Sequence, residues 1–353
     1  MRFSSRLGVF GALMFSLNSA HAVDIKGAGA NPAEAMYKAL AAGYGKTDPF
    51  GFSYQATDSA DGIKQIRAKA VDFGATEILP SKEQRKQDNL VAFPTAISGV
   101  APIFNLPGLR SGQLKLTGEL LADIFSRKIV KWNDPRLVAV NAGVALPDLP
   151  INVLVRSDNS GTTYNFTEYL SQSSPAWKAA YARNFTIAWA AGTTPIKGSA
   201  ATATAMKTTV GAIGYVDFKF ASREKLSLVS LKNRDGNFVL PGAAAFSAAI
   251  ANSSWMTKPE YDEMLINRPG AASWPITAST FVLVPRASSA PERTVAVLKM
   301  FTWGFMHGDE VVGKNEYVRL PEAVQGRIFG EMGSLTDAAG APLKWSLADI
   351  MKL

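Results

Sequence analysis

A polar stretch at residues 156–163 carries the side chains best suited to binding an anion. It follows an apolar run at residues 153–155 and precedes apolar residues at helical spacing. Arg156 opens the stretch with a planar, always charged donor fork, and Gly161 lets a ligand approach the backbone closely. Three hydroxyl donors complete it: Ser160, Thr162 and Thr163. A strand, a polar turn and a helix start together present free backbone N–H groups to an anion. The same sequence is also compatible with an ordinary N-cap next to an unrelated arginine.

A second junction of the same kind lies near the start of the chain. Residues 23–30 read VDIKGAGA, a short strand running into glycines, and Asn31 and Pro32 follow. Asparagine is a good N-cap, proline fits the first helical position and Glu34 can close a capping box, so we predict a helix capped by Asn31. Apolar side chains at helical spacing support it: Met36, Leu40 and Tyr44.

A third junction follows a strand that we predict at residues 52–55. The polar run TDSADG comes next, and we place the hydroxyl of Ser59 at the N-cap of the following helix. A capping pair of Asp58 and Asp61 is the alternative. The letters VDFGATE at residues 71–77 then indicate a short strand with Glu77 at its carboxyl end.

Alternating strands and helices predict an α/β fold. In such folds ligands bind beyond the carboxyl ends of the strands, against helix N-termini, so the three junctions are expected to share one site. Further elements are expected along the chain: a strand at 91–100, a helix at 116–125, a loop and then a helix at 192–205, a strand at 280–284 and a helix at 291–306.

The first 22 residues read as a signal peptide. Arg2 and Arg6 precede an apolar run at residues 7–17, and Ala20-His21-Ala22 is a small-x-small cleavage signal. We therefore expect cleavage after Ala22 and a periplasmic protein, with release outside the cell as the second choice. The chain has no cysteine, which excludes disulfides and a lipid anchor on a thiol.

Composition argues against several classes of function. The formal net charge is +8, but the basic residues are scattered and do not alternate with aromatics, so no nucleic-acid partner is expected. With His21 removed, His307 is the only histidine, and we expect it at the C-terminal end of a helix. Neither a histidine-based metal cluster nor a Ser-His-Asp triad can be built, so we expect no metal, no cofactor and no catalytic residue.

Taken in order, the motifs resemble the periplasmic phosphate-binding protein of the high-affinity (Pst-type) phosphate ABC transporter over essentially the whole mature chain. The motifs are GAGA at 27–30, KQI at 64–66, VDFGA at 71–75, NLPGL at 105–109, KWND at 131–134, RSDNSGTT at 156–163, GAIGYV at 211–216 and WPIT at 274–277. SGT with an arginine four residues before its serine is fairly specific, and the ordered set is stronger than any single motif.

The resemblance implies a two-lobed, type II periplasmic solute-binding protein that holds its ligand in the cleft between the lobes. Lobe I would comprise residues 23–95 and 275–353, with both chain ends, and lobe II residues 96–274. The family's phosphate ligands carry over to five positions: Ser59, Arg156, Ser160, Gly161 and Thr162. Asp158 matches the acid that orients the arginine. The implied partners are inorganic phosphate and the membrane permease of an ABC transporter, and we expect a monomer.

Two further ligands depart from the family's pattern. Asn31 stands where the family has a threonine; its amide can donate, whereas the next residue, Pro32, has no N–H. Glu77 replaces an aspartate that accepts the proton of phosphate and repels unprotonated sulfate. We expect an ionised Glu77 to keep that role, with Arg156 and the helix N-termini holding its pKa below the working pH.

Other departures change the surroundings of the site. Asp58 and Asp61 stand where glycines are usual and add negative charge near a site for an anion. A Gly-Asn-Asp-Gly segment of the family is replaced by KGSAATAT at residues 197–204.

We therefore predict a solute-binding protein that captures inorganic phosphate and delivers it to a permease. One alternative is the same scaffold serving a phosphonate, a phosphate ester or another oxyanion. A second is an exported phosphatase in which Glu77 activates Ser160 or Thr162 as nucleophile. A third is a secreted adhesion protein that has lost its ligand.

Overall fold

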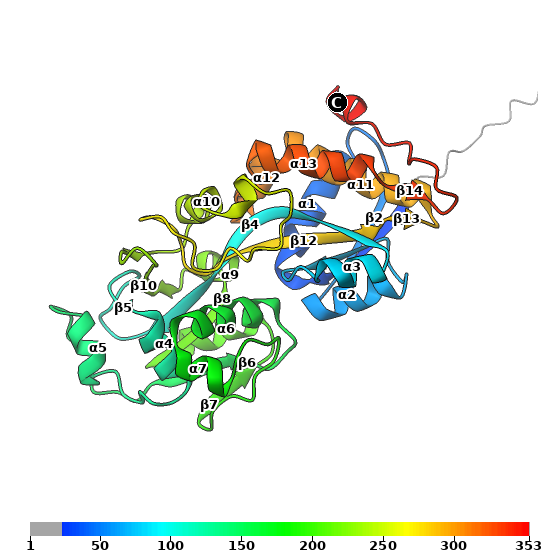
Figure 1. Cartoon of the computed structure of the whole chain (residues 1–353). Coiled ribbons are helices and arrows are strands. Elements are labelled where there is room, and N and C mark those ends of the chain that lie inside the picture. Colours follow the sequence, from blue (N-terminus) through cyan, green and yellow to red (C-terminus); the bar gives the residue numbers. More distant parts are fainter. Residues whose placement is uncertain (1–22, 353) are drawn as a thin grey trace, which may run out of the picture.

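The computed structural model describes residues 23–352, and its core is one mixed sheet that runs through two lobes (Figure 1). The nine strands of this sheet are β1 (Asp24–Ala30), β2 (Gly51–Thr57), β3 (Phe73–Thr76), β4 (Leu90–Asn105), β6 (Asn152–Arg156), β7 (Thr193–Ile196), β8 (Ala212–Asp217), β9 (Ser227–Leu228) and β12 (Thr277–Pro285). Eight of them lie in the order β2-β1-β3-β12-β4-β8-β6-β7, and β9 pairs with β4. The signal peptide predicted at residues 1–22 lies outside the described residues.

Strand β4 belongs to both lobes. Its residues 90–99 pair antiparallel with β12, and its residues 100–105 pair antiparallel with β8. Every β4 residue except the last is buried, as expected for an apolar run covered on both faces. The register against β12 shifts between Thr280 and Phe281, opposite Pro94, because proline has no N–H to give to the ladder.

The first lobe packs its helices around the parallel strands β1, β2 and β3. Three of these helices are α1 (Glu34–Tyr44), α2 (Ser59–Arg67) and α11 (Pro291–His307). Tyr37 meets Phe73 and Phe301 edge to face, with ring centroids 6.0 and 5.1 Å apart, so aromatic packing ties α1 to β3 and α11. The predicted stripe on α1 is confirmed, since Met36, Leu40 and Tyr44 are all buried.

The second lobe is built on β8, β6 and β7, with α4 (Gly118–Phe125) and α6 (Gly161–Ser173) packed against each other. Phe166 of α6 stacks on Tyr215 of β8 at 4.1 Å between ring centroids, and Phe125 of α4 lies 4.8 Å from Phe166. These buried rings fix α6 relative to α4 and β8. In this lobe residues 193–196 form β7, where the sequence predicted a loop.

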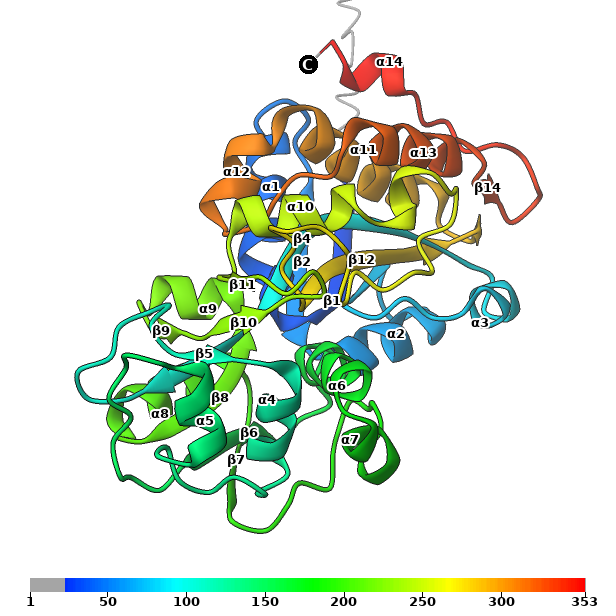
Figure 2. The same ribbon diagram turned by 60° about the vertical axis from the view of Figure 1, so that its left-hand side comes forward.

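The remaining elements surround the two lobes (Figures 1 and 2). The helices are η1 (Asn31–Ala33), α3 (Lys82–Gln87), α5 (Pro135–Val140), α7 (Pro175–Ala180), α8 (Ser199–Thr208), α9 (Phe218–Arg223), α10 (Ala243–Ala251), η2 (Ser254–Met256), α12 (Asp309–Lys314), α13 (Glu322–Gly333) and α14 (Leu347–Ile350). The short strands are β5 (Lys115–Leu116), β10 (Ser230–Lys232), β11 (Phe238–Val239), β13 (Ala287–Ser288) and β14 (Thr336–Asp337). Within residues 23–352 no helix combines the length and apolarity needed to cross a membrane.

The lobe boundaries remain a prediction. Residues 90–99 of β4 and all of β12 pair with each other, so the two crossings lie side by side. The segment before β12 already packs on the first lobe, because Arg327 of α13 donates a hydrogen bond to the carbonyl of Trp255 in η2. This contact places part of residues 96–274 against first-lobe elements.

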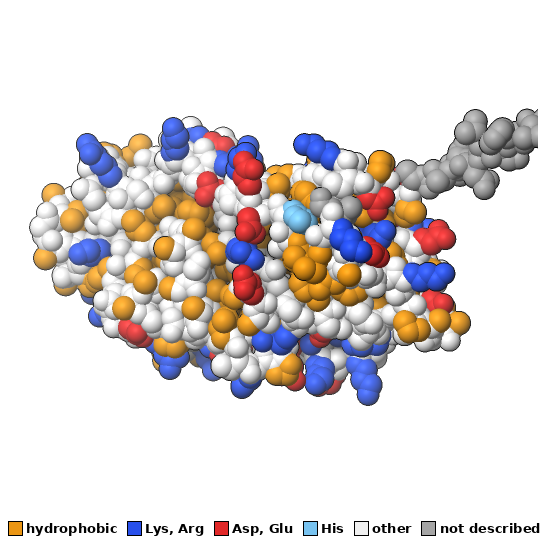
Figure 3. All heavy atoms as spheres, turned by 90° about the horizontal axis from the view of Figure 1, so that it is seen from above, with side chains coloured by type: hydrophobic (Ala, Val, Ile, Leu, Met, Phe, Trp, Pro, Cys, Tyr) orange, Lys and Arg blue, Asp and Glu red, His pale blue; other side chains and the backbone are white. Residues whose placement is uncertain are grey.

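The surface carries charges of both signs. On the face seen in Figure 3, basic and acidic side chains are interspersed and no continuous basic area is present. This distribution agrees with the scattered basic residues of the sequence. His307 is exposed and is the last residue of α11, which confirms its prediction as a helix C-terminal histidine.

Candidate functional site

Arg156 is buried at the carboxyl end of β6 and is held on three sides. Its Nε and Nη2 donate to the two carboxylate oxygens of Asp158 at 2.8 and 2.5 Å, and its Nη1 donates to Oγ of Ser199 at 2.8 Å. Burial disfavours the charged form of Arg156, but the hydrogen bonds and charge of Asp158 outweigh burial and keep its pKa above the ordinary value. The guanidinium is therefore charged, fixed and only 7% exposed.

Asp158 is the acid that orients this arginine. Besides the guanidinium, Asp158 accepts the backbone N–H of Gly198 at 3.0 Å, which connects the turn after β6 to the start of α8. Burial raises the pKa of Asp158, whereas Arg156 and the Gly198 N–H lower it, and the net shift is downward. Asp158 is thus ionised at neutral pH.

Helix α6 begins at the same place and confirms the predicted strand-to-helix junction. Ser160 is its N-cap, and the Ser160 Oγ accepts the N–H of Thr163 at 3.2 Å. The hydroxyl of Thr163 forms a 2.8 Å hydrogen bond with the hydroxyl of Tyr215, so Thr163 faces the core. Because the first N–H groups of a helix have no acceptor within it, those of Gly161 and Thr162 point out of this end.

The N-termini of α2 and α6 face each other across the two lobes (Figure 2). A Cβ added to Gly161 would lie 2.5 Å from Oγ of Ser59 and 2.7 Å from Oε2 of Glu77. The Oγ1 of Thr162 donates to the same carboxylate at 3.4 Å, and Oγ of Ser59 accepts the backbone N–H of Glu77 at 3.1 Å. Two helix starts, one from each lobe, therefore share one buried polar space.

Five of the seven predicted phosphate ligands are side chains buried in this space, and Gly161 is buried with them: Ser59, Glu77, Arg156, Ser160 and Thr162. The seventh, Asn31, is exposed. It lines an open cavity of about 820 Å³ together with Arg156, Asp158 and Ser199.

Two predictions of capping residues are wrong. Asn31 is already part of η1, whose N-cap is Ala30, and it makes no capping bond. A side chain caps a helix only from a residue with extended dihedral angles, so Asn31 inside the 3₁₀ turn is unavailable, and α1 starts at Glu34. The N-cap of α2 is Asp58, which accepts the N–H of Asp61 at 2.8 Å, as in the alternative considered above.

The predicted ionisation of Glu77 is also wrong. Burial, and to a smaller extent the nearby charge of Asp217, raise the pKa of Glu77 to about 8 against the opposing effects of Arg156, Thr162 and Lys219. The glutamate is 7% exposed, so loss of hydration outweighs one arginine. The raised pKa therefore favours a protonated Glu77 at neutral pH, and a protonated carboxyl group can donate a hydrogen bond.

Three buried polar residues of the site were missed from the sequence: Ser199, Asp217 and Lys219. Ser199 lies in the segment that lacks the family's pattern, and only its contact with Arg156 marks it. Asp217 and Lys219 stand in VDFKF, an alternation that equally predicts a strand with one solvated face. Burial raises the pKa of Asp217 to about 6, and Lys219 opposes that shift.

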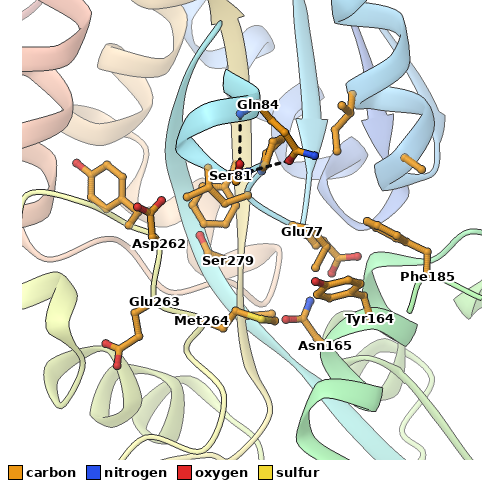
Figure 4. Close-up of a pocket in the computed structure, with 18 of the residues that line it drawn as sticks. Glu77, Ser81, Gln84, Tyr164, Asn165, Phe185, Asp262, Glu263, Met264 and Ser279 are labelled. Atoms are coloured by element: carbon orange, nitrogen blue, oxygen red, sulfur yellow. Dashed lines mark hydrogen bonds between the residues drawn. The ribbon is translucent and has the colours of Figure 1, made fainter. Parts of the chain in front are cut away.

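A second cavity, of about 770 Å³, opens on the other side of Glu77. Figure 4 shows Glu77 beside Tyr164 and Asn165 of α6, with Phe185 nearby and the side chain of Met264 pointing toward Asn165. Residues of both lobes line this cavity, as they line the cavity beside Arg156.

This architecture defines the class of two-lobed α/β solute-binding proteins, with a polar cleft between lobes joined by crossing strands. The family model described as a PBP superfamily domain matches residues 18–299. The phosphate-binding protein PstS of Pasteurella multocida is 38% identical over 336 residues, covering 95% of this chain and 97% of that protein. The phosphate-binding protein PstS of Haemophilus influenzae is 40% identical over 309 residues, covering 88% and 92%.

A solved structure agrees with the fold. A phosphate-binding protein of Stenotrophomonas maltophilia superposes with a TM-score of 0.65 at 20% identity, covering 88% of this chain and 94% of that one. The chain belongs to the family of the phosphate-binding proteins PstS.

Proposed function

We propose that this protein captures inorganic phosphate between its lobes and delivers it to the membrane permease of an ABC transporter. The observation that carries the proposal is the buried, fully oriented guanidinium of Arg156 beside the N-terminus of α6. A fixed planar cation and free helix N–H groups match the charge and the several acceptor oxygens of a tetrahedral oxyanion. The names of the PstS relatives support phosphate as that anion.

Seven residues are proposed as ligands: Asn31, Ser59, Glu77, Arg156, Ser160, Gly161 and Thr162. Those of the first lobe come from η1, α2 and the end of β3, and the others come from the end of β6 and the start of α6. Since neither lobe alone supplies all donors, binding requires that the lobes close. Asp158 and Ser199 support the site by holding Arg156.

The proposal includes export, cleavage after Ala22 and action in the periplasm as a monomer. Lobe I would comprise residues 23–95 and 275–353, and lobe II residues 96–274. Removal of bound anion by partial unfolding, followed by calorimetric titration with phosphate, tests the binding step. Saturable binding of one phosphate per chain is expected, and no heat of binding to the emptied, refolded protein would contradict it.

One observation favours a broader choice of oxyanion. Because burial raises the pKa of Glu77 to about 8, its carboxyl group can donate to an unprotonated oxygen at neutral pH. Sulfate would then be accepted in the same site. Competition between phosphate and sulfate separates the two specificities, and incubation with a chromogenic phosphomonoester tests for a phosphatase.

A further inference from the structure

Lys219 is a buried cation at the cleft that is not among the proposed phosphate ligands. It is 4% exposed and follows β8 at the start of α9, in the second lobe. Its Nζ donates a 2.6 Å hydrogen bond to the carbonyl oxygen of Pro32, 187 residues away in the first lobe. Within the described part of the chain this carbonyl is the only hydrogen-bond acceptor of the ammonium group, and the ring of Phe220 lies 5.0 Å from it.

The base of Lys219 is fixed by its own lobe. Asp217 caps α9, and its Oδ1 accepts the backbone N–H of Lys219 at 3.0 Å. Asp217 is itself 3% exposed, and it holds the backbone of Lys219 rather than the ammonium group. The side chain of Lys219 therefore reaches the first lobe from an anchored backbone.

The segment that Lys219 reaches carries Asn31. The carbonyl before it, of Ala30, accepts a 2.9 Å hydrogen bond from the hydroxyl of Tyr54 in the same lobe. The carbonyl after it, of Pro32, accepts the bond from Lys219 in the other lobe. Asn31 thus lies between two hydrogen-bonded carbonyls, and one of the two bonds comes from the other lobe.

The bond from Lys219 holds a segment that has few groups able to bind an anion. Pro32 has no N–H to offer an anion, so the segment depends on Asn31 and its amide. Two acidic residues, Asp58 and Asp61, line the same cavity as Asn31 and repel an anion, whereas Lys64 and Lys197 also line it and attract one. Lys219 adds a further positive charge at the carbonyl next to Asn31.

We propose that Lys219 is a positioning residue, which on closure binds the Pro32 carbonyl and thereby sets Asn31 toward the captured phosphate. The inference rests on the proposed function. A charged hydrogen bond across the lobes would be lost on opening, so closure and the placement of Asn31 are coupled. Loss of the Lys219 ammonium group should therefore weaken phosphate binding only when Asn31 is present.

The test is a double-mutant cycle of Lys219→Met and Asn31→Ala, with phosphate dissociation constants measured by calorimetry. Lys219→Met should weaken binding about ten-fold or more, as expected for loss of one charged hydrogen bond. In the Asn31→Ala background the same substitution should weaken binding at most about three-fold. Equal losses in both backgrounds, or no loss in the single variant, would overturn the proposal.

Matched variants separate this role from others. Lys178→Met removes an exposed charge of the same lobe, on α7, and should bind as the wild type does. Lys219→Gln keeps a donor without the charge and should recover part of the affinity. The ligand-free Lys219→Met protein should unfold at the wild-type temperature or above it, since a weakly paired buried charge contributes little to stability.

A lowered unfolding temperature with an unchanged affinity ratio between the two backgrounds would identify a structural lysine instead. If the wild-type protein does not bind phosphate at all, the proposed function is refuted. If the wild type binds phosphate and Lys219→Met binds it equally well, only the role of Lys219 is refuted.

Discussion

Gly161 and Ser59 are in contact across the lobes, with no room for a side chain between them: a Cβ on Gly161 would lie 2.5 Å from Oγ of Ser59. Real Cβ atoms essentially never come that close, so Gly161→Ala must hold the lobes apart. We expect phosphate affinity to fall by about 100-fold or more, because donors of one lobe no longer reach the anion.

Unfolding of the ligand-free Gly161→Ala protein should change little, since the first helical position accepts alanine and the lobes can stay open. Gly326→Ala on α13 is the matched control, because a Cβ there meets nothing within 4 Å. Small-angle scattering should show no phosphate-induced compaction in Gly161→Ala. Compaction equal to that of the wild type would contradict the contact.

Arg156→Ala should nearly abolish phosphate binding while the fold is kept. Charged hydrogen bonds contribute about 1.5–3 kcal/mol each, so the loss of two weakens binding by roughly 100-fold or more. Arg156→Lys should restore little, because one ammonium cannot replace the fork that Asp158 and Ser199 orient. Titration calorimetry measures both, and Arg183→Ala on the wall of the neighbouring cavity serves as control.

The preference for phosphate over sulfate should rise with pH. Below the raised pKa of about 8, protonated Glu77 donates to either anion. Above it, ionised Glu77 accepts the proton that dibasic phosphate still carries and repels sulfate, which carries none. Competition binding at about pH 6.5 and about pH 9.5 should therefore show a larger ratio at the higher pH, by about ten-fold for each unit above 8.

Glu77→Gln should remove this pH dependence. Its amide donates at every pH, so the variant should resemble the wild type at low pH and lose most of the phosphate preference at high pH. The same rise in preference for Glu77→Gln and wild type would identify another carboxylate, with Asp58 and Asp61 the next to replace.

Closure of the empty protein should weaken as pH rises. The pKa of Glu77 is raised in the closed structure from 4.5 to about 8, so closure retains a proton that the open or unfolded chain releases. The stabilisation is complete below about pH 4.5 and is lost as pH rises through 8. Scattering from the ligand-free protein should give a larger radius of gyration at about pH 9 than at about pH 6, with no such change for Glu77→Gln.

Local chemistry made much of the fold predictable. Ser160 caps α6 through a bond to a residue three positions away, and the apolar stripe of α1 is a property of its own spacing. The identity of the cap at Asn31 was not predictable in this way, because the geometry with which β1 enters η1 decides it.

Long-range contacts decided the rest of the site. The ammonium group of Lys219 is bound by a carbonyl 187 residues away, and the pKa of Glu77 is raised by its burial and by the charge of Asp217 in the other lobe. The sequence around Asp217 and Lys219 is equally compatible with a strand that has one solvent-exposed face. Sequence patterns therefore located the junctions that form the site but not the charges that meet there.

Strand β12 lies between β3 and β4 in the sheet but follows them in the sequence by about half the length of the chain. During synthesis or transport, the first lobe lacks strand β12 until residues 277–285 have emerged. Until then, the edges of β3 and β4 have no neighbour on the side that β12 will fill. Strand pairings between residues far apart in the sequence form slowly. The sheet of the first lobe is therefore completed late, after most of the chain has been synthesised or transported.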